Sequence, residues 1–143
     1  MFILDTDHIS VLERHEQPAF GHLVQRLAAI TPQELAYTVV SFGEQARGWM
    51  AFINGARKDA ELARGYFGLQ HILVRYSRAN VLPFNQSAID EFHRLRHAKV
   101  KIGTPDRRIA AIARVNQAVL LSRNLVDFQQ VPGLRVEDWS RPL

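Results

Sequence analysis

The sequence predicts an α/β fold, a three-layer α/β/α sandwich around a mostly parallel central sheet. Two observations lead to this prediction. Short apolar segments of strand length recur along the chain, and the longer segments between them carry apolar residues three and four positions apart, as helices do. No linker, repeat or low-complexity tract divides the chain, so we expect residues 1–143 to form a single domain. Strands separated by helices pair in parallel and are covered on both faces.

Each predicted strand is a short apolar segment. The strands are expected at residues 2–5, 36–40, 81–84, 118–122 and 134–136. Helices are expected at residues 7–14, 19–30, 41–54, 58–79 and 87–98, and from Pro105 onward, where a proline suits the first helical turn. Ligands of such a sheet bind beyond the carboxyl ends of its strands, so the residues that follow each strand are the candidates for function.

The composition is that of a globular protein, with 47% hydrophobic and 22% charged residues. The absence of cysteine excludes disulfides, zinc–thiolate sites and a cysteine nucleophile. The amino-terminal apolar run ends at Asp5 and has no basic region before it, so we expect neither a signal peptide nor a membrane anchor, and a cytoplasmic location. A net charge of +4 is compatible with a polyanionic partner, but charge alone is weak evidence for one.

Acidic and amide side chains follow the predicted strands. Asp5 ends the first strand, Glu44 lies shortly after the second, and Asn124 and Asp127 follow the strand 118–122. Asp106 opens the helix before that strand. Carboxylates gathered at one sheet edge repel one another, and a divalent cation relieves the repulsion. Oxygen ligands favour Mg²⁺, or Mn²⁺, over zinc, and such an ion activates water and neutralises charge on a phosphate.

Each acid also has an ordinary structural explanation. Asp5 can cap the helix that follows it. Ser41 and Glu44 have the S-x-x-E spacing of a capping box. Asp106 can complement a helix dipole, and Asp127 can be a loop residue. The joint placement of these residues after strands favours the functional interpretation.

Four segments together resemble the PIN domain, and within it the VapC-type ribonuclease toxins of bacterial toxin–antitoxin pairs. The segments are LDTDH, SFGEQ, GTPDRRIAAIA and LLSRNLVDFQQVPGLRVEDW, in family order over residues 1–139. The resemblance is most specific near the carboxyl terminus and loosest over residues 51–98. It implies a PIN-like sandwich, Mg²⁺-dependent endoribonuclease activity on tRNA or another structured RNA, and a cognate antitoxin protein that masks the site.

The resemblance also assigns site residues. Asp5, Glu44 and Asp106 match the three acids common to the family, and Ser122 matches a small hydroxyl residue that supports the site. A fourth acid is usual after the penultimate strand, where this chain has Asn124 and, three residues on, Asp127. We take Asp127 as the fourth catalytic and metal-binding acid, with Asn124 in support, and leave open whether one or two metal ions bind.

Other patterns are weaker. Asp5-Thr6-Asp7 resembles the loop of haloacid-dehalogenase-like phosphatases, but the Gly-Thr that usually follows is absent. His8 lies near Asp5 and is a conceivable base. His93 and His97 share a helix face, yet the arginines beside them disfavour a metal, so we expect solvated histidines. Neither glycine-rich phosphate-loop motif is present.

Basic residues cluster around Asp106. They are Arg94, Arg96, Lys99, Lys101, Arg107 and Arg108. This run is either a solvated helix end and loop or a rim that grips RNA phosphates; we predict RNA contacts for the last four. Phe42, Trp49 and Phe52 are expected in the core or at a partner surface, and the helices 58–79 and 87–98 as the face of a homodimer. The alternative function is a non-catalytic basic module that binds RNA or protein on the same fold.

Overall fold

A computed structural model describes residues 1–143 and contains a sheet of five strands, all of them parallel. The strands lie in the order β3-β2-β1-β4-β5. Their bounds are β1 Phe2–Leu4, β2 Leu35–Thr38, β3 Val81–Leu82, β4 Val119–Leu121 and β5 Arg135–Glu137. The first strand is central, with Ile3 paired to Ala36 on one side and to Leu120 on the other. The predicted α/β fold with a parallel sheet is confirmed.

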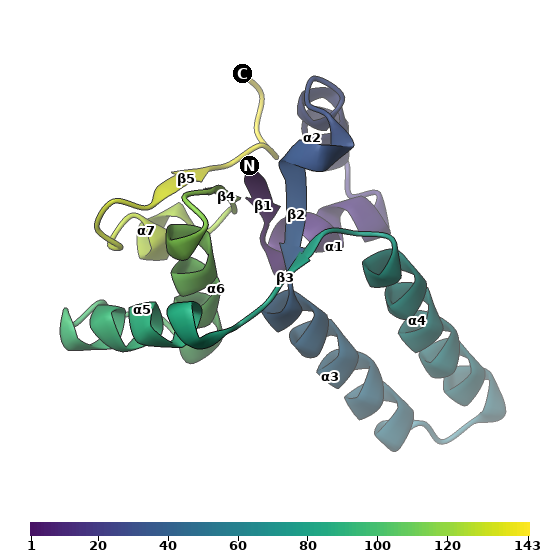
Figure 1. Ribbon diagram of the computed structural model, residues 1–143. Coiled ribbons are helices and arrows are strands. Elements are labelled where there is room, and N and C mark those ends of the chain that lie inside the picture. The colour runs from purple at the N-terminus through teal and green to yellow at the C-terminus, as the bar shows by residue number, and fades with distance from the viewer.

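Helices cover both faces of this sheet, as Figure 1 shows. They are α1 Thr6–Arg14, α2 Ala19–Leu27, α3 Val39–Gly55, α4 Asp59–Ser77, α5 Gln86–His97, α6 Thr104–Val115 and α7 Leu125–Phe128, with a 3₁₀ turn at Pro32–Glu34. Neighbouring residues of β1 point to opposite cores. Ile3 packs with residues of α5, α6 and α7, whereas Leu4 packs with residues of α1, α2 and α4. Period-two alternation thus builds a core on each side of the sheet.

Several element boundaries differ from the prediction. The second strand ends at Thr38 and not at residue 40, because the hydroxyl of Thr38 accepts a hydrogen bond from the Ser41 N–H at 3.1 Å and starts α3. Helix α2 ends at Leu27, three residues earlier than expected. The four-residue helix α7 was not predicted, because it is too short to show a helical period.

The α3–α4 hairpin is held by close contact between the two helices. A Cβ on Gly68 would overlap the indole ring of Trp49, and one on Gly65 would overlap the side chain of Ile53. Trp49 also meets Phe52 edge to face, with ring centroids 5.8 Å apart. Because Gly65 and Gly68 have no side chain, the backbone of α4 lies directly against Ile53 and Trp49 of α3. Trp49 and Phe52 are partly buried there, in keeping with the prediction of a core or partner surface.

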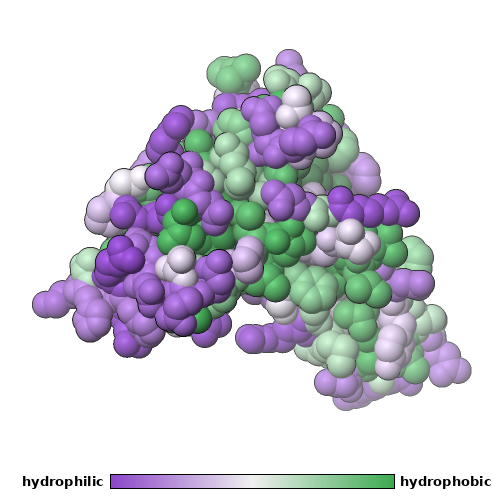
Figure 2. Space-filling model, in the orientation of Figure 1, coloured by the Kyte–Doolittle hydropathy of each residue, from purple (hydrophilic) through white to green (hydrophobic).

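The outer side of this hairpin exposes apolar residues, and Figure 2 shows them over α3 and α4, in contrast to the hydrophilic surface of α5. Phe67 is 70% exposed and Leu73 is 60% exposed. The homodimer predicted for this face and for α5 stays a prediction. None of the helices combines the length and apolar character that a membrane crossing requires.

Candidate functional site

Asp5 and Ser122 follow the two central strands, β1 and β4, and meet at the carboxyl edge of the sheet. Both are buried, Asp5 at 5% exposure and Ser122 at 0%. The Ser122 hydroxyl donates to Asp5 Oδ2 at 2.8 Å, and the Thr6 N–H donates to Asp5 Oδ1, also at 2.8 Å. Asp5 is thus the N-cap of α1, as one interpretation of the sequence proposed, and it also faces the predicted site.

Asp7 is a second carboxylate at this point, and the sequence did not mark it as a site residue. Its Oδ2 accepts from the Arg123 N–H at 2.9 Å and lies 3.1 Å from the Ser122 hydroxyl. Ser122 has one proton to donate, so it bonds Asp5 or Asp7 but not both at once. The Asn124 N–H in turn donates to Ser122 Oγ at 3.0 Å. Ser122 therefore links the acids after β1 to the loop after β4.

His8 supports Asp7 from the interior. The ring is fully buried, its Nδ1 lies 2.8 Å from Asp7 Oδ1, and its Nε2 accepts the Trp139 N–H at 3.2 Å. Because Nε2 accepts, Nδ1 carries the proton and donates it to Asp7. A histidine held in this way has no free nitrogen for catalysis. The idea of His8 as a base is therefore wrong, whereas His93 and His97 are exposed, as expected.

Glu44 lies on the second turn of α3 and reaches toward the end of β1. Its Oε1 accepts from the Thr6 hydroxyl at 3.1 Å, and the same hydroxyl lies 2.9 Å from Ser41 Oγ. The alternative explanation of Ser41 and Glu44 as a capping box is wrong, because Thr38 caps this helix and Ser41 lies inside it. Glu44 therefore does not cap the helix. Its bond from the Thr6 hydroxyl places its carboxylate near the end of β1.

Asp106 approaches from the first turn of α6, opposite Glu44. Its Oδ2 lies 3.4 Å from Asn124 Nδ2, which donates a shorter bond of 3.0 Å to Asp127 Oδ2. Asp127 belongs to the first turn of α7, so the alternative explanation of it as a loop residue does not hold. Asn124 bridges the two acids, and the structure brings both of them to the edge that Asp5 occupies.

Burial and mutual repulsion make these carboxylates hard to ionise. Burial, assisted by the charges of Asp7 and Asp106, raises the pKa of Asp5 from 3.8 to about 7. Burial and the charge of Asp106 raise the pKa of Glu44, and burial with the charges of Asp127 and Asp7 raises the pKa of Asp106. No lysine or arginine forms an ion pair with any of these three acids. The charge of Arg47 offsets part of the increase at Glu44, but no basic side chain of the chain forms an ion pair with Asp5, Glu44 or Asp106.

The donor set fits a small hard cation, and its arrangement constrains how one is held. Asp5, Glu44, Asp106 and Asp127 offer carboxylate oxygen, which is the ligand that Mg²⁺ prefers. No three of the acids lie close enough together to hold one ion jointly. Mg²⁺ commonly takes one or two carboxylates and keeps several waters, so pairs of acids such as those described here suit it.

The predicted basic rim is divided in the structure. Lys99, Lys101 and Arg108 are exposed. Arg107 instead turns back and donates to the carbonyl oxygens of Val100 at 3.0 Å and Ile102 at 3.2 Å. It fastens the loop before α6, and its predicted contact with RNA stays a prediction together with those of the other three residues.

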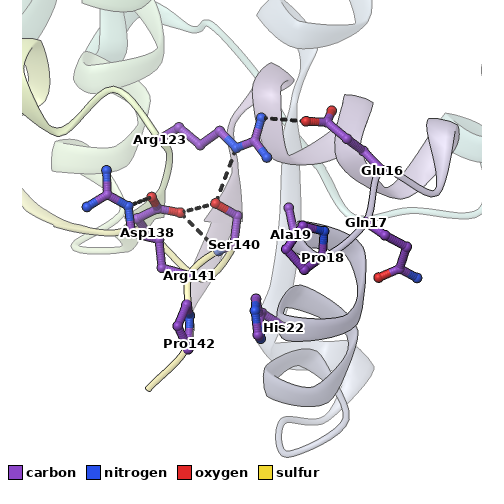
Figure 3. A pocket seen from close by; sticks show the side chains of 10 residues that line it. All are labelled: Glu16, Gln17, Pro18, Ala19, His22, Arg123, Asp138, Ser140, Arg141 and Pro142. Carbon is purple, nitrogen blue, oxygen red and sulfur yellow. Dashed lines mark hydrogen bonds and ion pairs between the residues drawn. The ribbon is translucent and has the colours of Figure 1, made fainter.

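A hollow of 370 Å³ lies between the segment after β5 and the start of α2 (Figure 3). Arg123 crosses it and bonds Ser140 Oγ and Glu16, both at 3.2 Å, while Arg141 pairs with Asp138 at 3.0 Å. Each arginine of this hollow thus has a carboxylate partner. The charges are compensated within the chain.

Carboxylates at the carboxyl edge of a five-stranded parallel sheet, covered by helices on both faces, are the arrangement of a PIN-like domain. The chain is 31% identical over 94 residues to the tRNA(fMet)-specific endonuclease VapC of Salmonella typhimurium, and the match covers 63% of this chain and 69% of that protein. The corresponding protein of Shigella flexneri is 30% identical over 95 residues, covering 64% and 70%. No family model matches the sequence.

Solved structures agree in fold over almost the whole chain. VapBC-1 from nontypeable Haemophilus influenzae superimposes with a TM-score of 0.76 at 22% identity, covering 98% of each chain. This chain belongs to the VapC family, the PIN-domain toxins of VapBC toxin–antitoxin systems. Its homologues in this family are endonucleases. The alternative resemblance to haloacid-dehalogenase-like phosphatases is thereby wrong.

Proposed function

We propose that this protein is a Mg²⁺-dependent endoribonuclease, the toxin of a toxin–antitoxin pair, which cuts tRNA or another structured RNA in the cytoplasm. The observation that carries the proposal is the group formed by Asp5, Glu44 and Asp106. These acids come from three distant parts of the chain, have raised pKa values and form no ion pair with a lysine or arginine. Buried charge without compensation destabilises a fold, so its retention at a sheet edge indicates a ligand that supplies the missing charge.

A bound Mg²⁺ would neutralise charge that develops on the scissile phosphate and provide an activated water. The ligands would come from pairs of acids among Asp5, Glu44, Asp106 and Asp127, with water completing the coordination, and Mn²⁺ has the same preference for oxygen. The chain's own residues orient these acids: Ser122 and the Thr6 N–H fix Asp5, the Thr6 hydroxyl fixes Glu44, and the Asn124 amide bridges Asp106 and Asp127.

Two partners follow from the proposal. The first is RNA. Both relatives are tRNA(fMet)-specific endonucleases, which supports tRNA as the substrate class. The second is an antitoxin protein, which the solved VapBC structures support. We propose a homodimer as the assembled form, as the resemblance implies.

The test is cleavage of a tRNA mixture with Mg²⁺ and with excess chelator, using wild type and Asp106→Asn. Wild type should cut only with Mg²⁺, and Asp106→Asn should not cut while it melts at the same or a slightly higher temperature, because one repelling charge is gone. Cleavage that persists in chelator would contradict the metal mechanism. Tight RNA binding by wild type without cleavage at any Mg²⁺ concentration would favour the non-catalytic module.

A further inference from the structure

A second hollow opens beside Glu44, on the side away from β5. It has a volume of 360 Å³ and lies between the start of α3, the start of α6 and the segment after β3. The surface is indented between the α3–α4 hairpin and the α5–α6 side (Figure 2). The side chains that matter here are Val39, Val40, Glu44, Arg47, Phe84 and Arg108. Since Glu44 lines this hollow and also bonds Thr6, the hollow is continuous with the acidic edge.

Arg47 and Arg108 face this hollow without a carboxylate partner. Arg47 comes one helical turn after Glu44, and Arg108 comes two residues after Asp106. Neither guanidinium forms an ion pair within the chain. In this they differ from Arg123 of the first hollow, which bonds Glu16 at 3.2 Å. Two guanidinium groups that line one hollow without an ion pair suit a phosphate, because their planar donors match its oxygens.

The floor of the hollow is apolar. Val39 is 40% exposed, although it stands at the first position of α3, and Phe84 is only partly buried. The Phe84 ring meets Phe92 edge to face, with centroids 6.1 Å apart, so its position is fixed. An apolar floor with a held aromatic ring suits a ribose or a base, just as the arginines suit a phosphate. The volume falls within the range of roughly 300–1,000 Å³ that small-molecule sites occupy.

We propose that this hollow is a nucleotide subsite for RNA, in which Arg47 and Arg108 hold the phosphate next to the one that is cut, and Val39 and Phe84 contact its ribose or base. The proposal rests on the endoribonuclease function proposed above. Neither arginine has an ion pair or a structural hydrogen bond. Arg47 acts on Glu44 through its charge, and Arg108 lies over the Phe92 ring, 6.0 Å from its centroid. Their neighbours Glu44 and Asp106 are acids of the predicted site.

The test compares two double variants that lose the same charge. Arg47→Gln with Arg108→Gln alters the hollow, and Arg57→Gln with Lys58→Gln alters the turn between α3 and α4 (Figure 1). That turn is distant, because α3 rises by roughly 16 Å over the eleven steps from Glu44 to Gly55. Binding of a single-stranded RNA oligonucleotide is measured over a range of salt, with Asp106→Asn added to every protein so that the RNA stays intact. Thermal melts confirm that each variant is folded.

The hollow variant should bind RNA at least about tenfold more weakly, and the slope of log affinity against log salt should fall by about one unit for the lost phosphate contact. The control variant should stay within about twofold of the parent, since a distant charge is screened. Arg47→Lys with Arg108→Lys should keep the salt slope while losing part of the affinity, because lysine retains the charge but not the planar donors.

Equal losses in the hollow and control variants, or no loss in the hollow variant, would overturn the subsite. The two proposals fail separately. If wild type cuts RNA with Mg²⁺ but both double variants bind alike, the subsite is wrong and the ribonuclease stands. If wild type never cuts RNA and only the hollow variant loses affinity, the proposed endoribonuclease function is wrong, whereas the hollow is still an RNA-binding site.

Discussion

The carboxyl edge of the sheet and the α3–α4 hairpin are held together in opposite ways. At the edge, buried Asp5 and partly buried Asp106 repel each other and have raised pKa values. In the hairpin, the Trp49 ring lies against the bare backbone of Gly68, and apolar packing joins two helices. Repulsion at the edge therefore lowers the stability of the metal-free fold at the place where we propose catalysis, whereas packing in the hairpin stabilises the fold. Substitutions in the two regions should have opposite effects on activity and on stability.

The largest effect is expected from Glu44→Gln. This change keeps the size and the bond from the Thr6 hydroxyl but removes the charge. RNA cleavage should fall by at least about 100-fold, the usual range for losing a catalytic acid or base, while the melting temperature stays the same or rises. Initial rates at saturating Mg²⁺, paired with a melt, measure both. Wild-type turnover would mean that Glu44 is a structural residue of α3.

Gly68→Ala should do the reverse. The added methyl group overlaps the Trp49 ring, so the helices must separate, at a loss of about 1–3 kcal/mol in the free energy of unfolding. Denaturant unfolding gives this number, and cleavage per folded molecule should be unchanged. Gly48→Ala is the matched control on α3, because no atom lies within 4 Å of a Cβ placed there. Equal stability of the two variants would show that α4 does not need Gly68 to pack.

The raised pKa of Asp5 predicts that the metal-free protein becomes less stable as the pH rises. The folded protein keeps the Asp5 proton to about pH 7, whereas the unfolded chain loses it near 3.8. Between these values the folded state binds more protons, so the stabilisation is complete below pH 3.8 and is lost as the pH rises through 7. Melts in chelator across this range should fall more steeply for wild type than for Asp5→Asn. Parallel curves would contradict the shift.

The smallest effect is expected at the bridge between Asp106 and Asp127. Asp127→Asn should raise the Mg²⁺ concentration for half-maximal cleavage several-fold, because one charge of a metal-binding set is lost. Asn124→Ala should mainly lower the rate at saturating Mg²⁺, because it frees both acids from the amide that bridges them. If Asp127→Asn has the same Mg²⁺ dependence as wild type, Asp127 does not belong to the site, which then consists of Asp5, Glu44 and Asp106.

The sequence predicted the edge better than it predicted the contacts within it. Parallel strands bring their carboxyl ends together, so the strand pattern alone placed Asp5 and Asn124 at the edge, whereas Ser122 was assigned by the resemblance to VapC-type toxins. Asp7 and Thr6 were missed because their bonds to Ser122 and Glu44 join residues 115 and 38 positions apart. Such pairings depend on which rotamers the packed edge allows, and no local pattern encodes them.

The sequence also did not show which of two similar neighbouring residues takes a given role. Thr38 and Ser41 both suit an N-cap, and only the end of β2 decides in favour of Thr38. Arg107 and Arg108 are adjacent in the sequence, yet α6 turns the first toward the Val100 carbonyl and the second outward. Arg47 belongs to no motif, and only the approach of α3 to α6 gives it a position at the site.

Calorimetric titration of Mg²⁺ into wild type and Asp106→Asn at pH 7, in buffers of different ionisation enthalpy, tests the central claim most directly. The claim is that the edge gathers repelling carboxylates in order to bind a cation. Wild type should bind Mg²⁺ and release protons, because Asp5 is partly protonated at this pH and must ionise to bind. Asp106→Asn should bind much more weakly. Equal binding by the two proteins, or binding to wild type without proton release, would contradict the claim.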